Sequence, residues 1–84
     1  MTILEFAQHC FILAYKYQAS VTSWGRTPDR NKLVGGHPNS RHMIWLGMDL
    51  VTDPMVKDEA LEKDAEFLGL KAIFEDDHYH LEPK

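Results

Sequence analysis

The sequence predicts a small α+β domain in which helices pack against a sheet of short strands. Helical and extended segments follow one another in the order αβαβαββ. Three observations predict this order: apolar residues at helical spacing in 3–17 and 53–69, strand-like segments at 20–24 and 44–51, and two short apolar segments at 71–74 and 78–81. We expect residues 1–84 to form one domain with a mixed or antiparallel sheet.

The first predicted helix covers residues 3–17. Its apolar residues recur at helical spacing: Ile3, Ala7, Cys10, Ala14 and Tyr17. Thr2 and Glu5 have the spacing of a capping box, which stabilises a helix N-terminus. Cys10 is the one cysteine of the chain, so it forms no internal disulfide, and we expect a small buried thiol.

Two short elements follow this helix. Residues 20–24 are partly β-branched and predict a strand. Thr27 is a favourable N-cap residue and Pro28 suits the first helical position, so we expect a helix of one to two turns that stops at Gly35.

The segment 44–51 predicts a central strand, because strongly apolar residues occupy every second position. Asp49 and Trp45 would then lie on the same face of that strand.

The second substantial helix is predicted with Asp53 as its N-cap, Pro54 in its first turn and Gly69 at its end. Two closing strands, at 71–74 and 78–81, would flank an acidic corner at 75–77.

The charge balance argues against two classes of partner. The net charge is −4 and no run of Lys or Arg occurs, so we expect neither nucleic acid nor a membrane surface as partner. The longest apolar run is far below the roughly 20 residues that cross a bilayer. No basic segment precedes the first apolar stretch, so we expect no export signal.

A metal site is predicted from a carboxylate and several histidines. Asp49 stands in an apolar strand, where a carboxylate is costly to bury unless donors or a cation compensate it. His42 precedes it, and His78 and His80 point to one side if they lie on a strand. Alone, each histidine is more often solvated or hydrogen-bonded than a ligand. Two neutral imidazoles and one carboxylate together leave zinc the open position of a catalytic site.

The segment SRHMIWLGMD, followed by DHYH near the C-terminus, is similar to the zinc D-Ala-D-Ala peptidase family, which is related to the zinc-binding domain of Hedgehog. The family pattern is Ser-x-His-x-x-Gly-x-Ala-x-Asp and then a terminal His. Upstream, VTSWGRTPDRNKLVGGHPNS is similar to the family segment in which an Arg after a strand precedes a short helix and two glycines. The resemblance covers residues 20–82 and implies the Hedgehog/DD-peptidase fold.

The resemblance also implies roles for individual residues. His42, Asp49 and His80 would bind a Zn²⁺ cofactor, and Ser40 and Arg26 would contact the substrate. The fork-shaped guanidinium of Arg26 suits an oxyanion or a terminal carboxylate. Two alternatives stay open: Arg26 is an unpartnered surface residue, and Ser40 caps a turn.

The general base has two candidates. Relatives place an acid three residues before the last ligand, which is Asp77 in this sequence. Strand alternation instead favours His78, which would share a face with His80. A further alternative is that residues 75–77 form a solvated acidic turn.

This sequence departs from the family pattern at two positions. The family's Gly falls at Trp45 and its Ala falls at Gly47. We expect the Trp45 ring to lie over Gly47, where it would border the substrate cleft. The alternative is that Trp45 crowds the cleft.

The resemblance implies a zinc metallopeptidase that hydrolyses peptide bonds of bacterial peptidoglycan, as a carboxypeptidase or endopeptidase. Its partners would be stem peptides or cross-links, and we expect a monomer that is cytoplasmic or phage-borne, such as an endolysin. The alternative is a non-catalytic zinc-binding or virion-structural module that retains the fold.

Overall fold

The computed structural model describes residues 1–37 and 41–84. Its elements are α1 (Ile3–Tyr17), β1 (Ser20–Ser23), α2 (Pro28–Leu33), the 3₁₀ helix η1 (Arg41–Ile44), β2 (Met48–Val51), α3 (Glu59–Phe67), β3 (Leu70–Phe74) and β4 (Tyr79–Pro83). The predicted α+β class is confirmed, and η1 is an addition to the predicted order. Among the described helices, none has the length and apolar character that crossing a membrane requires.

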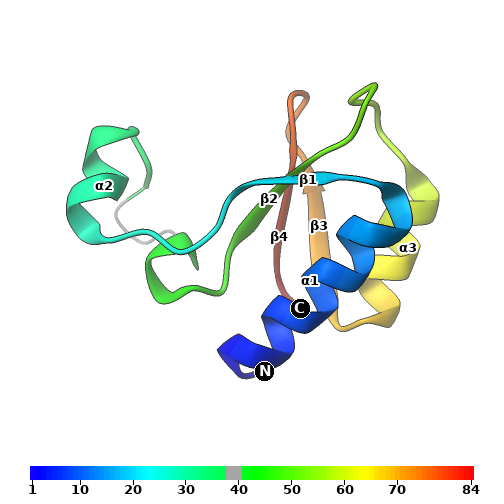
Figure 1. Ribbon diagram of the computed structural model, residues 1–84, viewed down its shortest axis with the longest axis horizontal. Helices are drawn as coiled ribbons and strands as arrows, with labels where there is room; N and C mark the ends of the chain where they lie inside the picture. Colours follow the sequence, from blue (N-terminus) through cyan, green and yellow to red (C-terminus); the bar gives the residue numbers. More distant parts are fainter. Residues whose placement is uncertain (38–40) are drawn as a thin grey trace.

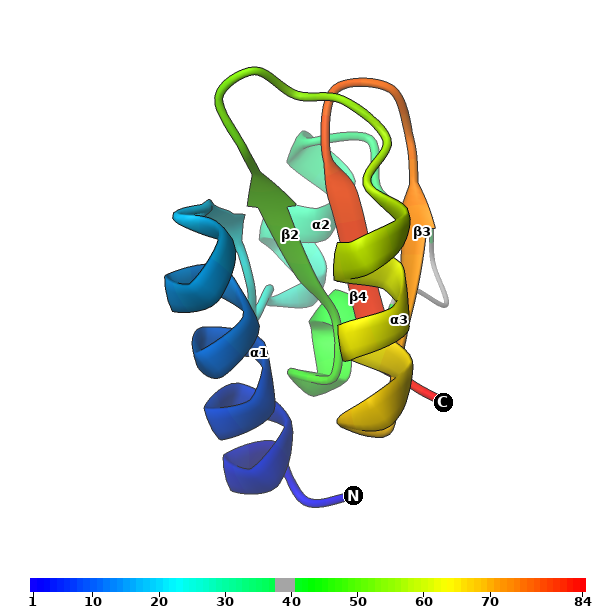
Figure 2. The ribbon, with the colours of Figure 1, turned by 90° about the vertical axis from the view of Figure 1, so that its right-hand side faces the viewer.

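The four strands form one antiparallel sheet in the order β1-β2-β4-β3. Helices α1 and α3 lie together on one face of this sheet, and α2 lies on the other side (Figure 2). Figure 1 shows α2 standing apart from the sheet, on the side away from α1 and α3, and joined to it by the segment that follows β1. This arrangement leaves one face of β2 and β4 uncovered by the two long helices.

The core lies between the sheet and the helices α1 and α3. Along β2 and β4, alternate side chains point into it, and the fully buried ones are Met48, Leu50, Tyr79 and Leu81. The residues between them in the sequence therefore point to the opposite face of the sheet. Cys10 is buried in this core as predicted, and burial raises the pKa of its thiol to about 12.

The caps of α1 and α2 are those that the sequence predicts. The Thr2 hydroxyl accepts the N–H of Glu5 at 3.1 Å, and the Glu5 carboxylate accepts the N–H of Thr2 at 3.0 Å. The Thr27 hydroxyl caps α2 by accepting the N–H of Arg30 at 3.2 Å, with Pro28 in the first turn. Local sequence therefore determines where both helices begin.

The predicted strand over 44–51 is wrong in its first half. Arg41–Ile44 forms η1, Trp45 has a left-handed φ of 61°, and the strand begins at Met48. The turn is closed by the N–H of Leu46, which donates to the carbonyl of Arg41 at 3.0 Å. Trp45 and Asp49 therefore share no strand face.

The expected packing of Trp45 on Gly47 is also wrong. A Cβ on Gly25 would lie 2.0 Å from the Trp45 indole, so that ring covers Gly25. Gly47 is needed for a different contact, because a Cβ there would lie 2.8 Å from the backbone nitrogen of His42. The turn that carries His42 is thereby packed tightly against Gly47.

The third helix begins later than the sequence predicts, at Glu59 with Asp58 as its N-cap in place of Asp53. The Asp58 carboxylate accepts the N–H of Ala60 at 3.0 Å. The N–H of Asp58 itself donates to the hydroxyl of buried Tyr79 at 2.7 Å. This contact with β4 favours Asp58 over the earlier Asp-Pro pair.

Candidate metal centre

The three predicted metal ligands lie together on the uncovered face of the sheet. Asp49 on β2 and His80 on β4 are direct partners in the antiparallel register. His42 reaches the same place from η1, whose turn is closed against Gly47. One ligand atom from each of the three lies within 4.8 Å of the others.

The carboxylate of Asp49 lies between the two imidazoles. Its Oδ1 is 3.2 Å from Nε2 of His42 and 3.2 Å from Nδ1 of His80. Burial alone raises the pKa of Asp49, but the hydrogen bonds from His42 and His80 and the positive charge nearby outweigh it and hold the pKa well below its usual range. The carboxylate is therefore ionised at neutral pH.

Each imidazole uses its second nitrogen to hold the ring. Nδ1 of His42 donates to the carbonyl oxygen of Trp24 at 2.8 Å. Nε2 of His80 lies 3.3 Å from a carboxylate oxygen of Glu82 and donates to it. Histidines that bind metals in proteins have this arrangement, in which the non-ligating N–H is given to a carbonyl or a carboxylate.

These contacts determine which nitrogen faces Asp49. A neutral imidazole has one N–H and one lone pair, so His42 and His80 direct their lone pairs at the same carboxylate oxygen. Lone pairs at 3.2 Å repel one another unless a cation lies between them, either a proton on the ring or a metal ion. In the metal-free protein, the hydrogen bond with Asp49 raises the pKa of His80 against burial, and the contact with Glu82 adds to it.

The donor set fits zinc in type and spacing. Two nitrogens and one oxygen are ligands that zinc prefers, and three protein ligands leave a coordination position open. Bonds of about 2.0–2.1 Å to a tetrahedral ion place neighbouring ligand atoms about 3.3 Å apart, which agrees with the two distances from Oδ1 of Asp49, and all three ligand atoms lie within 4.8 Å of one another.

A hollow of about 450 Å³ adjoins Asp49, between β1 and α2, and Arg26 and Arg30 also line it. The Arg26 guanidinium donates from Nη1 to Oδ1 of Asn31 at 2.8 Å and from Nη2 to Oγ of Ser23 at 3.4 Å. The predicted substrate-contacting arginine therefore borders the same space as a metal ligand.

The two candidate bases lie beside each other at the end of the β3–β4 hairpin. Nε2 of His78 is 3.8 Å from Oδ1 of Asp49 and 3.1 Å from a carboxylate oxygen of Glu75. Nδ1 of His78 is 2.6 Å from Asp77, whose side chain is 87 % exposed. His78 thus faces the cluster directly, and Asp77 contacts its far side.

The remaining predicted site residues are Ser40 and Trp45. Ser40 lies outside the described residues. The Trp45 ring is half-exposed and makes an edge contact with Trp24 at a centroid distance of 5.1 Å. Among the described residues that line the hollow beside Asp49, Trp45 does not occur, so its ring does not fill that space.

Three contacts of the site were missed by the sequence reasoning. The amide of Asn31 holds Arg26, the carboxylate of Glu82 holds His80, and the carbonyl of Trp24 holds His42. Glu82 could have been found, because it stands two residues after His80 and shares its strand face. The carbonyl of Trp24 carries no signal in the sequence.

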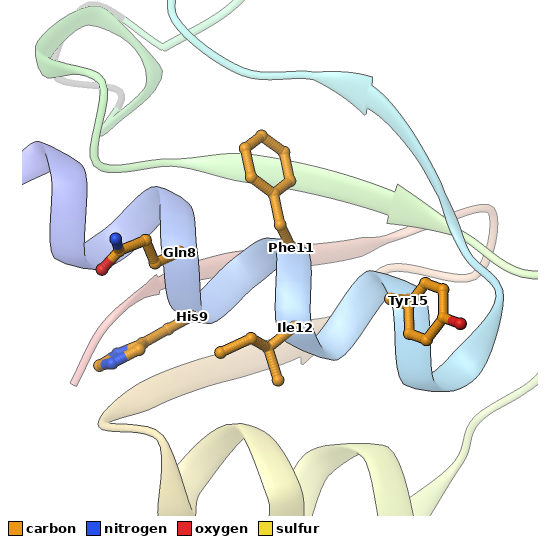
Figure 3. Close-up of a pocket in the computed structure, with 5 residues that line it drawn as sticks. All are labelled: Gln8, His9, Phe11, Ile12 and Tyr15. Carbon is orange, nitrogen blue, oxygen red and sulfur yellow. The ribbon is translucent and has the colours of Figure 1, made fainter.

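A second hollow, of about 650 Å³, lies along the outside of α1 (Figure 3). Its lining residues come from successive turns of that helix: Gln8, His9, Phe11, Ile12 and Tyr15. It is the larger of the two hollows, but it contains a single imidazole and no carboxylate. The group of side chains that could hold a metal ion therefore lies at Asp49 and not on α1.

No protein-family model, curated protein or solved structure matches this chain.

Proposed function

We propose that this protein is a zinc-dependent peptidase with the Hedgehog/DD-peptidase fold, which hydrolyses peptide bonds of bacterial peptidoglycan as a carboxypeptidase or endopeptidase. One observation carries the proposal. His42, Asp49 and His80 converge with each imidazole held through its other nitrogen, as ligands of a metal are. The motif spacing and the order of the elements agree with the peptidase family that the sequence resembles.

Three protein ligands are typical of a catalytic zinc site, because a structural zinc site has four. A zinc ion bound by these residues would supply Lewis acidity, which activates water for attack at neutral pH. The hollow beside Asp49 gives a peptide access to this position. Arg26, which borders the hollow, would bind negative charge on the peptide, either a terminal carboxylate or the oxyanion that develops at the scissile carbonyl.

His78 would accept the proton during hydrolysis and then donate it to the leaving amine. The reactive tautomer would be the one whose Nδ1–H donates to Asp77, so that Nε2, which lies 3.1 Å from a carboxylate oxygen of Glu75 and 3.8 Å from Oδ1 of Asp49, carries the lone pair that accepts the proton. A base held in this tautomer by a carboxylate is oriented for proton transfer. Asp77 would then act through His78, although the family resemblance assigns the base to Asp77 itself.

Digestion of purified peptidoglycan tests the proposal. We expect the native protein with zinc to release new amino groups, which can be labelled and identified by mass spectrometry, and we expect a chelator to abolish the release. His78→Ala should lose at least about 100-fold in rate, as expected when a general base is removed. Asp77→Asn should lose less, because the His78 ring remains. The matched control is Asp76→Asn, an exposed neighbour whose left-handed backbone suits Asn.

The outcomes separate the alternatives. Loss of activity in Asp77→Asn but not in His78→Ala would assign the base to Asp77. Zinc binding without any turnover would refute the peptidase and support a non-catalytic zinc-binding or virion-structural module. Absence of zinc binding in the native protein would refute the peptidase and the zinc-binding module.

A further inference from the structure

Asn31 is a buried polar residue of α2 with a fixed side-chain orientation. Its side chain is only 3 % exposed, and its Nδ2 donates to the carbonyl oxygen of His37 at 2.9 Å. The amide oxygen must therefore face the other way, where it accepts from Nη1 of Arg26 at 2.8 Å. Both ends of this amide are thus used.

The contact with Asn31 restricts an arginine that would otherwise be mobile. Fixing a long side chain costs rotamer entropy, so a half-buried arginine keeps one orientation only when several contacts hold it. Arg26 has two side-chain contacts, with Asn31 and with Ser23, and its backbone N–H donates to the carbonyl of His42. Arg30, which lines the same hollow, has no side-chain partner among the described residues.

Gly36 leaves the space in which Arg26 and Asn31 meet. A Cβ on Gly36 would lie 2.1 Å from Oδ1 of Asn31 and 2.5 Å from Nη1 of Arg26. The backbone of Gly36 does not have a left-handed φ, so a glycine is needed at this position only because a side chain would not fit. The preceding Gly35 differs, because it has a φ of 72° and nothing within 4 Å of a Cβ. Glycine is therefore favoured at these two neighbouring positions for different physical reasons.

We propose that Asn31 is a positioning residue, which holds the Arg26 guanidinium at the edge of the hollow beside Asp49 so that Arg26 receives an anionic group of the ligand there. The inference rests on the proposed function for the identity of that ligand, a peptide with a carboxylate or a developing oxyanion. Its structural part, the immobilisation of Arg26 by Asn31 in the space left by Gly36, is independent of catalysis.

Side-chain NMR of the arginines tests the structural part directly. We expect the guanidinium of Arg26 to rotate slowly and to give separate Nη signals, and that of Arg30 to give averaged signals as an internal control. In Asn31→Leu and in Gly36→Ala, the Arg26 signals should become averaged as well. The amide spectrum of the strands reports whether each variant remains folded.

Asn31→Asp separates positioning from a purely structural role. Aspartate keeps an acceptor for Arg26 but loses the donor to the carbonyl of His37. We expect Arg26 to remain immobile in this variant. Averaged Arg26 signals in the native protein, or immobile Arg26 in Asn31→Leu, would overturn the inference.

Kinetics on peptidoglycan fragments test the functional part. We expect Asn31→Leu to lower kcat/KM by up to about 100-fold, because a misplaced group near the reacting atoms has effects of that size. Asn31→Asp should recover most of this loss. In an Arg26→Ala background, Asn31→Leu should cause little further loss of kcat/KM, whereas a purely structural role of Asn31 would make the two losses additive.

If the native protein binds zinc but hydrolyses nothing, the proposed function fails and the inference is tested with acetate alone. Titration at constant ionic strength should then shift the Arg26 side-chain signals in the native protein and not in Asn31→Leu. An unchanged native spectrum would overturn the anion-receiving role, whatever the enzymatic result.

Discussion

Zinc is expected to stabilise the folded protein, by an amount that depends on the contacts of the metal centre. A ligand that binds only the folded state at 100 times its Kd stabilises it by about 2.7 kcal/mol. A domain of this size gains about 4–8 °C in Tm for each kcal/mol. Zinc at that concentration should therefore raise the Tm by roughly 10–20 °C relative to protein with chelator.

Two substitutions should reduce this rise in a defined order. Glu82→Ala removes the partner of the non-ligating nitrogen of His80, and such losses lower metal affinity about 10–100-fold. At the same zinc concentration, roughly 0.4–1.4 kcal/mol of the stabilisation would remain. Asp49→Asn removes a ligand and should abolish the rise. The control is Asp53→Asn, an exposed acid with the same change of charge, which should keep the full rise.

Differential scanning calorimetry with and without zinc measures the rise, and isothermal titration gives the affinity. A native protein that zinc does not stabilise would refute the metal centre. An equal rise in Asp49→Asn and in the native protein would show that zinc binds elsewhere on the chain.

Four further predictions follow from individual contacts. Zinc affinity should increase between pH 6 and pH 8, because the hydrogen bond with Asp49 raises the pKa of His80 and zinc must displace that proton; titration calorimetry giving a constant affinity would contradict this. The free energy of unfolding of the metal-free protein should fall as the pH rises. The pKa of His80 is raised in the folded state, so protonated His80 stabilises the fold below the usual pKa of 6.5, and this stabilisation is lost as the pH rises through the raised pKa. Tyr79→Phe should lower the free energy of unfolding in urea by about 1–3 kcal/mol, because the half-buried N–H of Asp58 loses its acceptor; an unchanged midpoint would contradict this. Gly25→Ala should displace the Trp45 ring and change tryptophan fluorescence, since a Cβ would lie 2.0 Å from the indole; an unchanged spectrum would disprove that packing.

Local signals in the sequence were sufficient for some elements. Helix α1 has its predicted bounds because its capping box and its apolar spacing act over a few residues. The alternation over 44–47 misled, because residues in a tight turn can show the same alternation by chance. Hydrogen bonds from Leu46 and Trp45 back to η1 make the turn, and they depend on Gly47 packing against His42. Such contacts are invisible to a periodicity argument.

The candidate site was predictable in its ligands and not in the groups that hold them. Residue type indicated a metal site of Asp49 with histidines, the family resemblance selected His42 and His80 among them, and the structure brings the three together. The partner of His42 is a backbone carbonyl, which any residue at position 24 would supply. The hydrogen bond between Asn31 and Arg26 depends on how α2 folds back over the segment after β1, and no pattern in the sequence encodes how close the two side chains come.

The geometry of the candidate metal centre follows from the packing of the core on the other side of the sheet. Asp49 lies opposite His80 because Leu50 pairs with Tyr79 and Met48 with Leu81, and these four side chains are buried. A slip of one residue between β2 and β4 would turn one strand over and bury its ionisable residue in the core. The cost of that burial, several kcal/mol for an ion without a partner, fixes the register. Two of the three ligands are thus held by the hydrophobic core, and only His42 depends on the turn that Gly47 permits.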